Sequence, residues 1–298
     1  MGLVSAAVQE LLRLLGSPAG LQQIATDLRI EPSLPLPVLA AGSVREDPAE
    51  RPWLVRDGFA GLGAAAPPET CASLVSGIRA LRARGLPATF VYAFDEPWAL
   101  GEVVRQRISA LVGHDYSVVE DAWAWQIEPG EGGWPPHRGI AHERLDREAP
   151  EVVNVWVALS DVTADRGCMH AIPLDEDPSY PHALDHVDAP LSAVRALPVP
   201  AGHALFWNAN VLHWGGRCAA RAAGPRVSCS FTLCRTDSAA RFPELSLLSA
   251  STPLDFARRS DLLARMVLLY GKDQPDVSEV VREWASITHG LASRFSRP

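Results

Sequence analysis

The amino-acid sequence predicts a mainly β protein with helical flanks, built on a double-stranded β-helix core of the jelly-roll, cupin-like kind. From Tyr116 to Cys234, short apolar or alternating segments are separated by turns rich in proline and glycine, the pattern of a closed antiparallel β domain. Outside this region, apolar residues recur at helical spacing. With 298 residues, 47% of them hydrophobic, the chain can bury one sizeable core. We expect a single domain with a helical and extended N-terminal elaboration (1–115), a β core (116–235) and C-terminal helices (236–298).

The N-terminal elaboration is expected to combine helices with one extended stretch. Its periodic segments end near glycine or proline, which stop helices, and one of them begins at Pro68, a residue favoured in the first helical turn. The proline-rich stretch Glu31–Pro52 is predicted to wrap around the domain in extended form. The predicted helices are Val4–Leu15, Leu21–Leu28, Pro67–Arg84 and Trp98–Val112.

The β core is expected to contain short strands, followed by helices that brace the outside of the sheet or form an oligomer contact. The pattern specifies no oligomeric state. The predicted strands are Tyr116–Glu128, Val152–Ser160, Cys168–Ile172, Val194–Val199, His203–Trp207 and Val227–Cys234. The predicted C-terminal helices are Leu254–Tyr270 and Val277–His289.

Composition argues against several classes of partner. The net charge is −8 and no basic run is present, which argues against a nucleic acid polymer. No apolar run reaches the roughly 18 residues of a membrane span, and no secretory leader is recognisable, so we expect a cytoplasmic protein without a membrane partner. Five cysteines, an odd number with no Cys-X-X-Cys pair, argue against a disulfide framework and a structural zinc site.

One motif carries the most chemical information. His137-Arg138-Gly139 lies in a glycine- and proline-rich loop before the apolar run 152–159, and His213 follows a second apolar strand. Arg226-Val227-Ser228 comes shortly afterwards. This order resembles that of the iron(II)/2-oxoglutarate oxygenases, which hold iron with two histidines and one carboxylate on one face of an octahedron.

The resemblance extends from about residue 121 to residue 234 and can be stated more closely. The segments VWVALSDVT (155–163) and GCMHAIP (167–173) resemble the phytanoyl-CoA dioxygenase-like family. WAWQ (123–126), before the His137 loop, and PAGHALF (200–206), before His213, are also similar to strands of that family.

This resemblance implies a set of site residues. His137 and His213 are expected to bind Fe(II), and Arg226 is expected to bind the far carboxylate of 2-oxoglutarate, because a guanidinium matches a carboxylate bidentately. Ser228 is expected to add a hydrogen bond to that carboxylate. Trp125, Gln126, Asn154 and Trp156 are expected to line the co-substrate or substrate pocket, with aromatic packing as the alternative for the tryptophans. Asn208 and Asn210 are expected to donate hydrogen bonds around the second histidine.

Gly139 departs from the family's His-X-Asp pattern. A glycine in place of the carboxylate resembles the iron halogenases, in which chloride takes the vacated coordination position, so the implied cofactors are Fe(II), 2-oxoglutarate, chloride and O2. The implied reaction is chlorination of an unactivated C–H bond in a free small molecule. Two alternatives are a hydroxylase with an unusual metal site, in which Glu143 or Asp146 reaches the iron, and a non-catalytic ligand-binding relative.

The arginines around the motif bear on the substrate. Arg138, Arg144 and Arg147 surround the first histidine, and Arg217 and Arg221 follow the second. They favour an anionic small molecule, such as a phosphorylated, nucleotide-like metabolite, with solvated loop arginines as the alternative. The segment around His182 and His186 is expected to be an irregular surface lid, although this spacing could also bind zinc on a helix.

Overall fold

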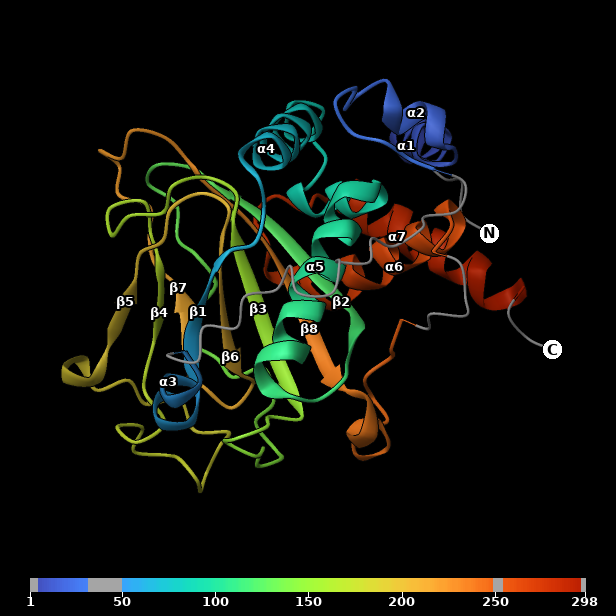
Figure 1. Cartoon of the computed structure of the whole chain (residues 1–298). Coiled ribbons are helices and arrows are strands. Elements are labelled where there is room, and N and C mark those ends of the chain that lie inside the picture. Colours follow the sequence, from blue (N-terminus) through green and yellow to red (C-terminus); the bar gives the residue numbers. More distant parts are fainter. Residues whose placement is uncertain (1–4, 32–49, 249–253, 296–298) are drawn as a thin grey trace.

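Two antiparallel sheets form the core of the protein (Figure 1). The computed structural model describes residues 5–31, 50–248 and 254–295. The larger sheet has the order β1 (Phe59–Ala64), β6 (His203–Asn208), β3 (Val152–Ala158), β8 (Arg226–Arg235) and β2 (Tyr116–Ile127). The smaller sheet has the order β5 (Arg195–Leu197), β4 (Met169–Ala171) and β7 (His213–Gly215). The predicted jelly-roll core is therefore confirmed.

Helices cover one face of the larger sheet, as Figure 1 shows. α5 packs against β2 and β8, and α6 packs against β2 and against α7, so the C-terminal helices are joined to the sheet. The fully buried Arg259 of α6 donates to Asp95 at the start of α5 over 2.6 Å, which ties these two helices together. The bounds of these elements are α4 (Pro68–Ala83), α5 (Asp95–Val112), α6 (Phe256–Tyr270) and α7 (Glu279–Phe295).

The N-terminal part differs from the prediction in three places. β1 pairs with β6, so the region before residue 116 contributes a strand to the main sheet and is more than a flank. The second helix, α2, covers Pro18–Gln22 instead of Leu21–Leu28, and α1 covers Ala6–Leu15. Most of the predicted extended wrap, 32–49, lies outside the described residues, but its end belongs to the helix α3 (Glu50–Asp57).

The β1 strand was missed because its sequence, Phe-Ala-Gly-Leu-Gly-Ala, has low strand propensity. Gly63 has a φ of +68°, which L side chains rarely adopt, and the register with β6 shifts between Gly61 and Gly63. Pairing with β6, and not local preference, therefore holds this strand in place. No helix within the described ranges is long and apolar enough to cross a membrane.

Candidate active site

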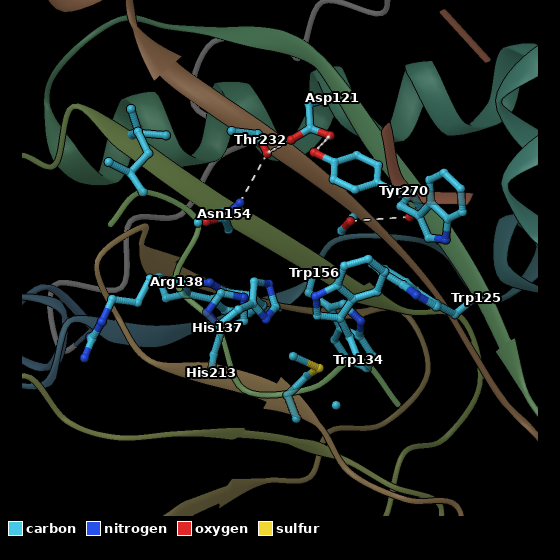
Figure 2. A pocket seen from close by; sticks show the side chains of 18 of the residues that line it. Asp121, Trp125, Trp134, His137, Arg138, Asn154, Trp156, His213, Thr232 and Tyr270 are labelled. Carbon is cyan, nitrogen blue, oxygen red and sulfur yellow. Dashed lines mark hydrogen bonds between the residues drawn. The ribbon is translucent and has the colours of Figure 1, made fainter. Parts of the chain in front are cut away.

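His137 and His213 lie side by side between the two sheets. His213 begins β7, and His137 lies in the long loop between β2 and β3. The two residues exchange both backbone hydrogen bonds, each with an N to O distance of 3.0 Å. Their ring centroids are 4.2 Å apart (Figure 2). The fold thus brings together the two histidines that the motif predicts as metal ligands.

The backbone orients both imidazole rings in the same way. Nδ1 of His137 lies 2.9 Å from the carbonyl oxygen of Pro135, and Nδ1 of His213 lies 2.9 Å from that of Val211. Because a carbonyl only accepts, Nδ1 carries the proton in each ring, and Nε2 keeps a free electron pair. A backbone hydrogen bond of this kind is how metal-binding histidines are usually oriented.

Burial favours the neutral form of both rings. It lowers the pKa of His137 and lowers the pKa of His213 well below its usual range, with the neighbouring His137 as a second cause for His213. A neutral imidazole is the form that binds a metal ion. Two neutral Nε2 atoms on adjacent rings therefore fit Fe(II), for which imidazole is a suitable ligand.

The space next to Gly139 is filled, contrary to the expectation of an open position. A Cβ atom built on Gly139 would lie 2.3 Å from Oδ1 of Asn154 and 3.2 Å from Cβ of Ala209. Oδ1 of Asn154 has no hydrogen-bond partner among the described residues. A buried amide oxygen therefore stands where the side chain of an aspartate at position 139 would begin.

The two carboxylates considered as substitutes for the missing ligand have other partners. Glu143 forms an ion pair with Arg241, and Oδ1 of Asp146 accepts a hydrogen bond of 2.8 Å from the backbone N of Glu148. In the described parts of the chain, no three side chains of His, Cys, Asp or Glu are grouped so that they could hold a metal ion. His182 and His186, whose zinc-binding alternative required a helix, lie in an irregular segment.

Asn208 and Asn210 hold the loop that follows the first histidine. Asn210 accepts from the N of Leu145 over 2.8 Å and donates to the carbonyl oxygen of Ile140 over 2.8 Å. Asn208 donates to the carbonyl oxygen of Asp146 over 3.1 Å. These bonds connect β6 and its following turn to the loop, so the two asparagines position the loop instead of donating to the histidine rings.

Arg226 is a buried cation without an acidic partner in the described residues. Its exposed fraction is 2%, no ion pair includes it, and its Nε has no acceptor. One Nη donates to the carbonyl oxygen of Gly167. Burial lowers the pKa of Arg226 to about 10, so it is still charged at neutral pH. Ser228, on the same face of β8, is fully buried, and its Oγ also lacks a partner. A ligand carboxylate next to Arg226 would compensate its charge.

A cavity of about 240 Å³ is lined by both histidines and by Arg226, but not by Ser228. Of the predicted pocket residues, Trp125, Asn154 and Trp156 line it together with the histidines, Gly139 and Arg226. Gln126 is not among its lining residues, and its amide donates to Glu128 instead.

The loop arginines do not form an anion site in this cavity, so they do not support the expectation of an anionic substrate. Arg138 lines it, but its guanidinium forms a fully buried ion pair of 2.6 Å with Asp177. Arg147 pairs with Asp175, and Arg217 donates to the carbonyl oxygen of Gly130. Arg144 and Arg221 are not among the lining residues. The support for a phosphorylated, nucleotide-like substrate is therefore lost.

Four polar side chains from four different elements form a hydrogen-bonded chain along one wall (Figure 2). Nδ2 of Asn154 donates to Oγ1 of Thr232 over 3.2 Å, and Thr232 donates to Asp121 over 3.2 Å. Tyr270 of α6 donates to the other oxygen of Asp121 over 2.9 Å. Burial raises the pKa of Asp121, and the hydrogen bonds from Tyr270 and Thr232 partly offset this rise.

Three members of this chain were not identified in the sequence. Asp121 had a usable signal, because it alternates along β2 with Trp123 and Trp125, and alternate residues of a strand face one side. Thr232 could have been found in the same way from Ser228 and Ser230 on β8. Tyr270, by contrast, reaches the cavity from the end of a helix with no motif.

Comparisons with known proteins agree with this fold. Residues 86–223 match the phytanoyl-CoA dioxygenase (PhyH) family. "Dioxygenase lolE1" of Epichloe uncinata is 25% identical over 117 residues, which cover 38% of this chain and 44% of that protein. This chain thus spans less than half the length of that curated relative.

Two solved structures share the fold. The apo form of ThoJ, a non-heme monooxygenase, superposes with a TM-score of 0.52 at 16% identity, covering 78% of this chain and 99% of that chain. AviO1 from Streptomyces viridochromogenes Tue57 superposes with a TM-score of 0.50 at 18% identity, covering 65% of this chain and 97% of that chain. The family match supports the iron- and 2-oxoglutarate-dependent oxygenase superfamily, and these two structures show a common fold.

Proposed function

We propose that this protein is an Fe(II)- and 2-oxoglutarate-dependent oxygenase of a free small molecule, and that it acts as a halogenase. One observation carries the oxygenase class: Arg226, a buried guanidinium without an acidic partner among the described residues, lines the same cavity as two adjacent histidines whose Nδ1 atoms both face a backbone carbonyl. When bound, iron and 2-oxoglutarate supply the oxidation of a substrate C–H bond by O2. The halogenase assignment rests on Gly139, which offers no carboxylate to the metal.

Each residue has a defined task in this proposal. Nε2 of His137 and Nε2 of His213 would hold Fe(II), and the backbone carbonyls at their Nδ1 atoms fix the orientation of each ring. Arg226 and Ser228 would bind the far carboxylate of 2-oxoglutarate, because each has a buried polar atom without a hydrogen-bond partner among the described residues. The buried rings of Trp156 and Trp207 line the cavity and keep bulk water from the reacting carbon.

Asn154 supports a second candidate, a hydroxylase with an unusual metal site. From standard bond lengths, an aspartate at position 139 would place its carboxylate oxygens about 2.4 Å from its Cβ. Oδ1 of Asn154 lies 2.3 Å from the Cβ position built on Gly139. The amide oxygen thus lies at the distance of the missing ligand, and as a neutral third ligand it would leave no place for a halide.

Halide response separates the two candidates. For a halogenase, we expect the absorption band of the anaerobic Fe(II)–2-oxoglutarate complex to shift when chloride or bromide is added, because the transferred atom begins as an iron ligand. Turnover with a metabolite extract should give a product with the isotope pattern of the halogen supplied. In Asn154→Ala the halide response should persist, with unchanged or tighter halide binding.

The hydroxylase predicts the opposite set of results. The absorption band of the parent Fe(II)–2-oxoglutarate complex would not shift when halide is added. The product would gain oxygen equally well with and without chloride, and Asn154→Ala would weaken Fe(II) binding in chloride-free buffer. A non-catalytic relative would form no succinate from 2-oxoglutarate with any substrate set.

Replacing Arg226 tests the co-substrate site. We expect Arg226→Met to leave Fe(II) binding intact and to weaken 2-oxoglutarate by about 2–5 kcal/mol, as when one partner of a buried charge pair is removed. Because the charge is uncompensated without the ligand, the same variant should raise the melting temperature of the ligand-free protein. Calorimetric titration and thermal unfolding measure the two effects. Unchanged 2-oxoglutarate affinity would assign the carboxylate to another residue.

A further inference from the structure

One charged side chain that lines the cavity has no role in the proposal so far. The lining residues that carry charge are Asp121, Arg138 and Arg226. Arg138 is neutralised by Asp177, and Arg226 is assigned to 2-oxoglutarate. Asp121 forms no ion pair with any cation of the described residues and is half-buried at the cavity wall. Once 2-oxoglutarate is bound, Asp121 therefore remains as the unneutralised charge that faces the substrate space.

The neighbours of Asp121 leave room for a further donor. An ionised carboxylate has about four acceptor sites. The hydroxyl groups of Tyr270 and Thr232 fill two of them, one on each oxygen. Both hydroxyls donate, which stabilises the ionised form. A ligand that completes this set must donate hydrogen bonds, and a positive charge on it would also compensate the partly buried carboxylate.

Aromatic rings continue from Asp121 to the metal site. The ring of Tyr270 packs edge-on against Trp123, with centroids 5.6 Å apart, and against Trp134, with centroids 6.0 Å apart. Trp134 in turn lies 5.9 Å from the ring of His137. Figure 2 shows Tyr270 next to Asp121, and Trp134 on the side of the histidines. Aromatic faces attract cations through their quadrupole, with energies that increase when the cation is desolvated.

We propose that the substrate is a compact amine in its protonated form, whose ammonium group binds Asp121 within this aromatic wall. The inference rests on the proposed function, because it names the substrate class of the same cavity. Asp121 is separated from Gly139 by the side chains of Thr232 and Asn154. An ammonium held by Asp121 would therefore direct the carbon skeleton of the substrate towards the histidines.

The same features disfavour other small molecules. A phosphate or carboxylate placed here would be repelled by Asp121, since like charges placed opposite each other in an interface weaken binding. The cavity volume of about 240 Å³ is below the roughly 300–1,000 Å³ of pockets for drug-sized ligands. A small aliphatic amine fits both the charge and the volume better than a nucleotide.

Matched ligands of one shape test the proposal. The probes are cyclohexylammonium, piperidinium and benzylammonium, each compared with the alcohol and the carboxylate of similar size, on the protein loaded with Fe(II) and 2-oxoglutarate without O2. Binding is followed by tryptophan fluorescence, because Trp123, Trp125 and Trp134 line the cavity. We expect at least one ammonium ion to bind about tenfold or more tightly than its matched alcohol, and the carboxylates to bind most weakly.

Asp121→Asn keeps the shape of the side chain and removes its charge. We expect it to weaken the ammonium about 10-fold to 100-fold and to leave the alcohol unchanged. Glu120→Gln is the control on the same strand, because Glu120 pairs with Arg258 and Arg265 and does not line the cavity. Retained Fe(II) and 2-oxoglutarate binding shows that each variant is folded.

Two results would overturn the amine proposal. One is that no ammonium ion binds the parent protein more tightly than its matched alcohol, a comparison that needs no variant. The other is that Asp121→Asn binds the ammonium as well as the parent does. If the protein bound the amine but neither Fe(II) nor 2-oxoglutarate, the oxygenase proposal would be rejected and the amine site would stand. Failure of the oxygenase proposal can therefore be distinguished from failure of the amine proposal.

Discussion

His213→Ala is expected to abolish tight Fe(II) binding. The described residues offer two nitrogen ligands and no carboxylate at this site, so each histidine supplies half of the protein's coordination. Even partners that only orient a metal ligand contribute 10-fold to 100-fold in affinity. Loss of the ligand itself should therefore weaken Fe(II) more than about 100-fold. Anaerobic Fe(II) titration, with the absorption of the 2-oxoglutarate complex as the signal, measures this loss.

His203→Ala is the matched control for this variant. Its Nδ1 also faces the carbonyl oxygen two residues earlier, at 3.4 Å, but His203 does not line the cavity. We expect it to bind Fe(II) like the parent protein. If His137→Ala and His213→Ala both retained the affinity of the parent, the metal site would have to lie elsewhere in the chain.

The β core could be predicted from local patterns, and the family resemblance of the His-X-Gly motif pointed to two histidines that the structure places side by side. Their role as metal ligands stays a prediction. Strand periodicity marks β2, β3, β6 and β8, and the His-X-Gly motif with its downstream histidine and arginine identifies residues that an antiparallel sheet brings together. The glycine-rich strand β1 has no such pattern, since its conformation is set by pairing with β6.

The walls of the cavity could not be predicted in the same way. Tyr270 reaches Asp121 across 149 positions of the sequence, and the pairing of Arg138 with Asp177 spans 39. Such contacts depend on the packing of elements and leave no local signature. For this reason Arg138 was expected from the sequence to be available for an anionic substrate. In the structure Arg138 forms an ion pair with Asp177, and Asp121 is the charged group that has no ion-pair partner among the described residues.

Asn154 shows what was available in the sequence and what was not. An asparagine within the apolar run 152–159 marks a polar side chain on a buried strand, so its placement in the pocket was predictable. Its Oδ1 also occupies the space of the missing side chain at Gly139. This contact was not predictable, because it depends on how β3 crosses the loop that carries His137. This contact determines how the glycine can be tested.

Gly139→Asp alone is expected to fail as a restored metal site. Its Cβ would lie 2.3 Å from Oδ1 of Asn154, and Asn154 is held by Thr232. The new carboxylate and the amide oxygen are both acceptors and would repel each other. Combining the substitution with Asn154→Ala removes this oxygen and leaves the contact of 3.2 Å to Cβ of Ala209 as the remaining close approach. We therefore expect the double variant to bind Fe(II) more tightly than either Gly139→Asp or the parent in chloride-free buffer.

The same double variant should completely lose the halide chemistry that we propose for the parent, because an aspartate ligand would fill the coordination position that chloride requires. The absorption of its Fe(II)–2-oxoglutarate complex should not shift when chloride or bromide is added. Its products should contain no halogen, because it should either hydroxylate the substrate or not turn over. Gly139→Ala with Asn154→Ala is the steric control: it introduces the same Cβ without a ligand, so it should retain the halide response. If the aspartate double variant incorporated halogen as well as the parent, Gly139 would not mark the halide position, and the halogenase proposal would lose its structural basis.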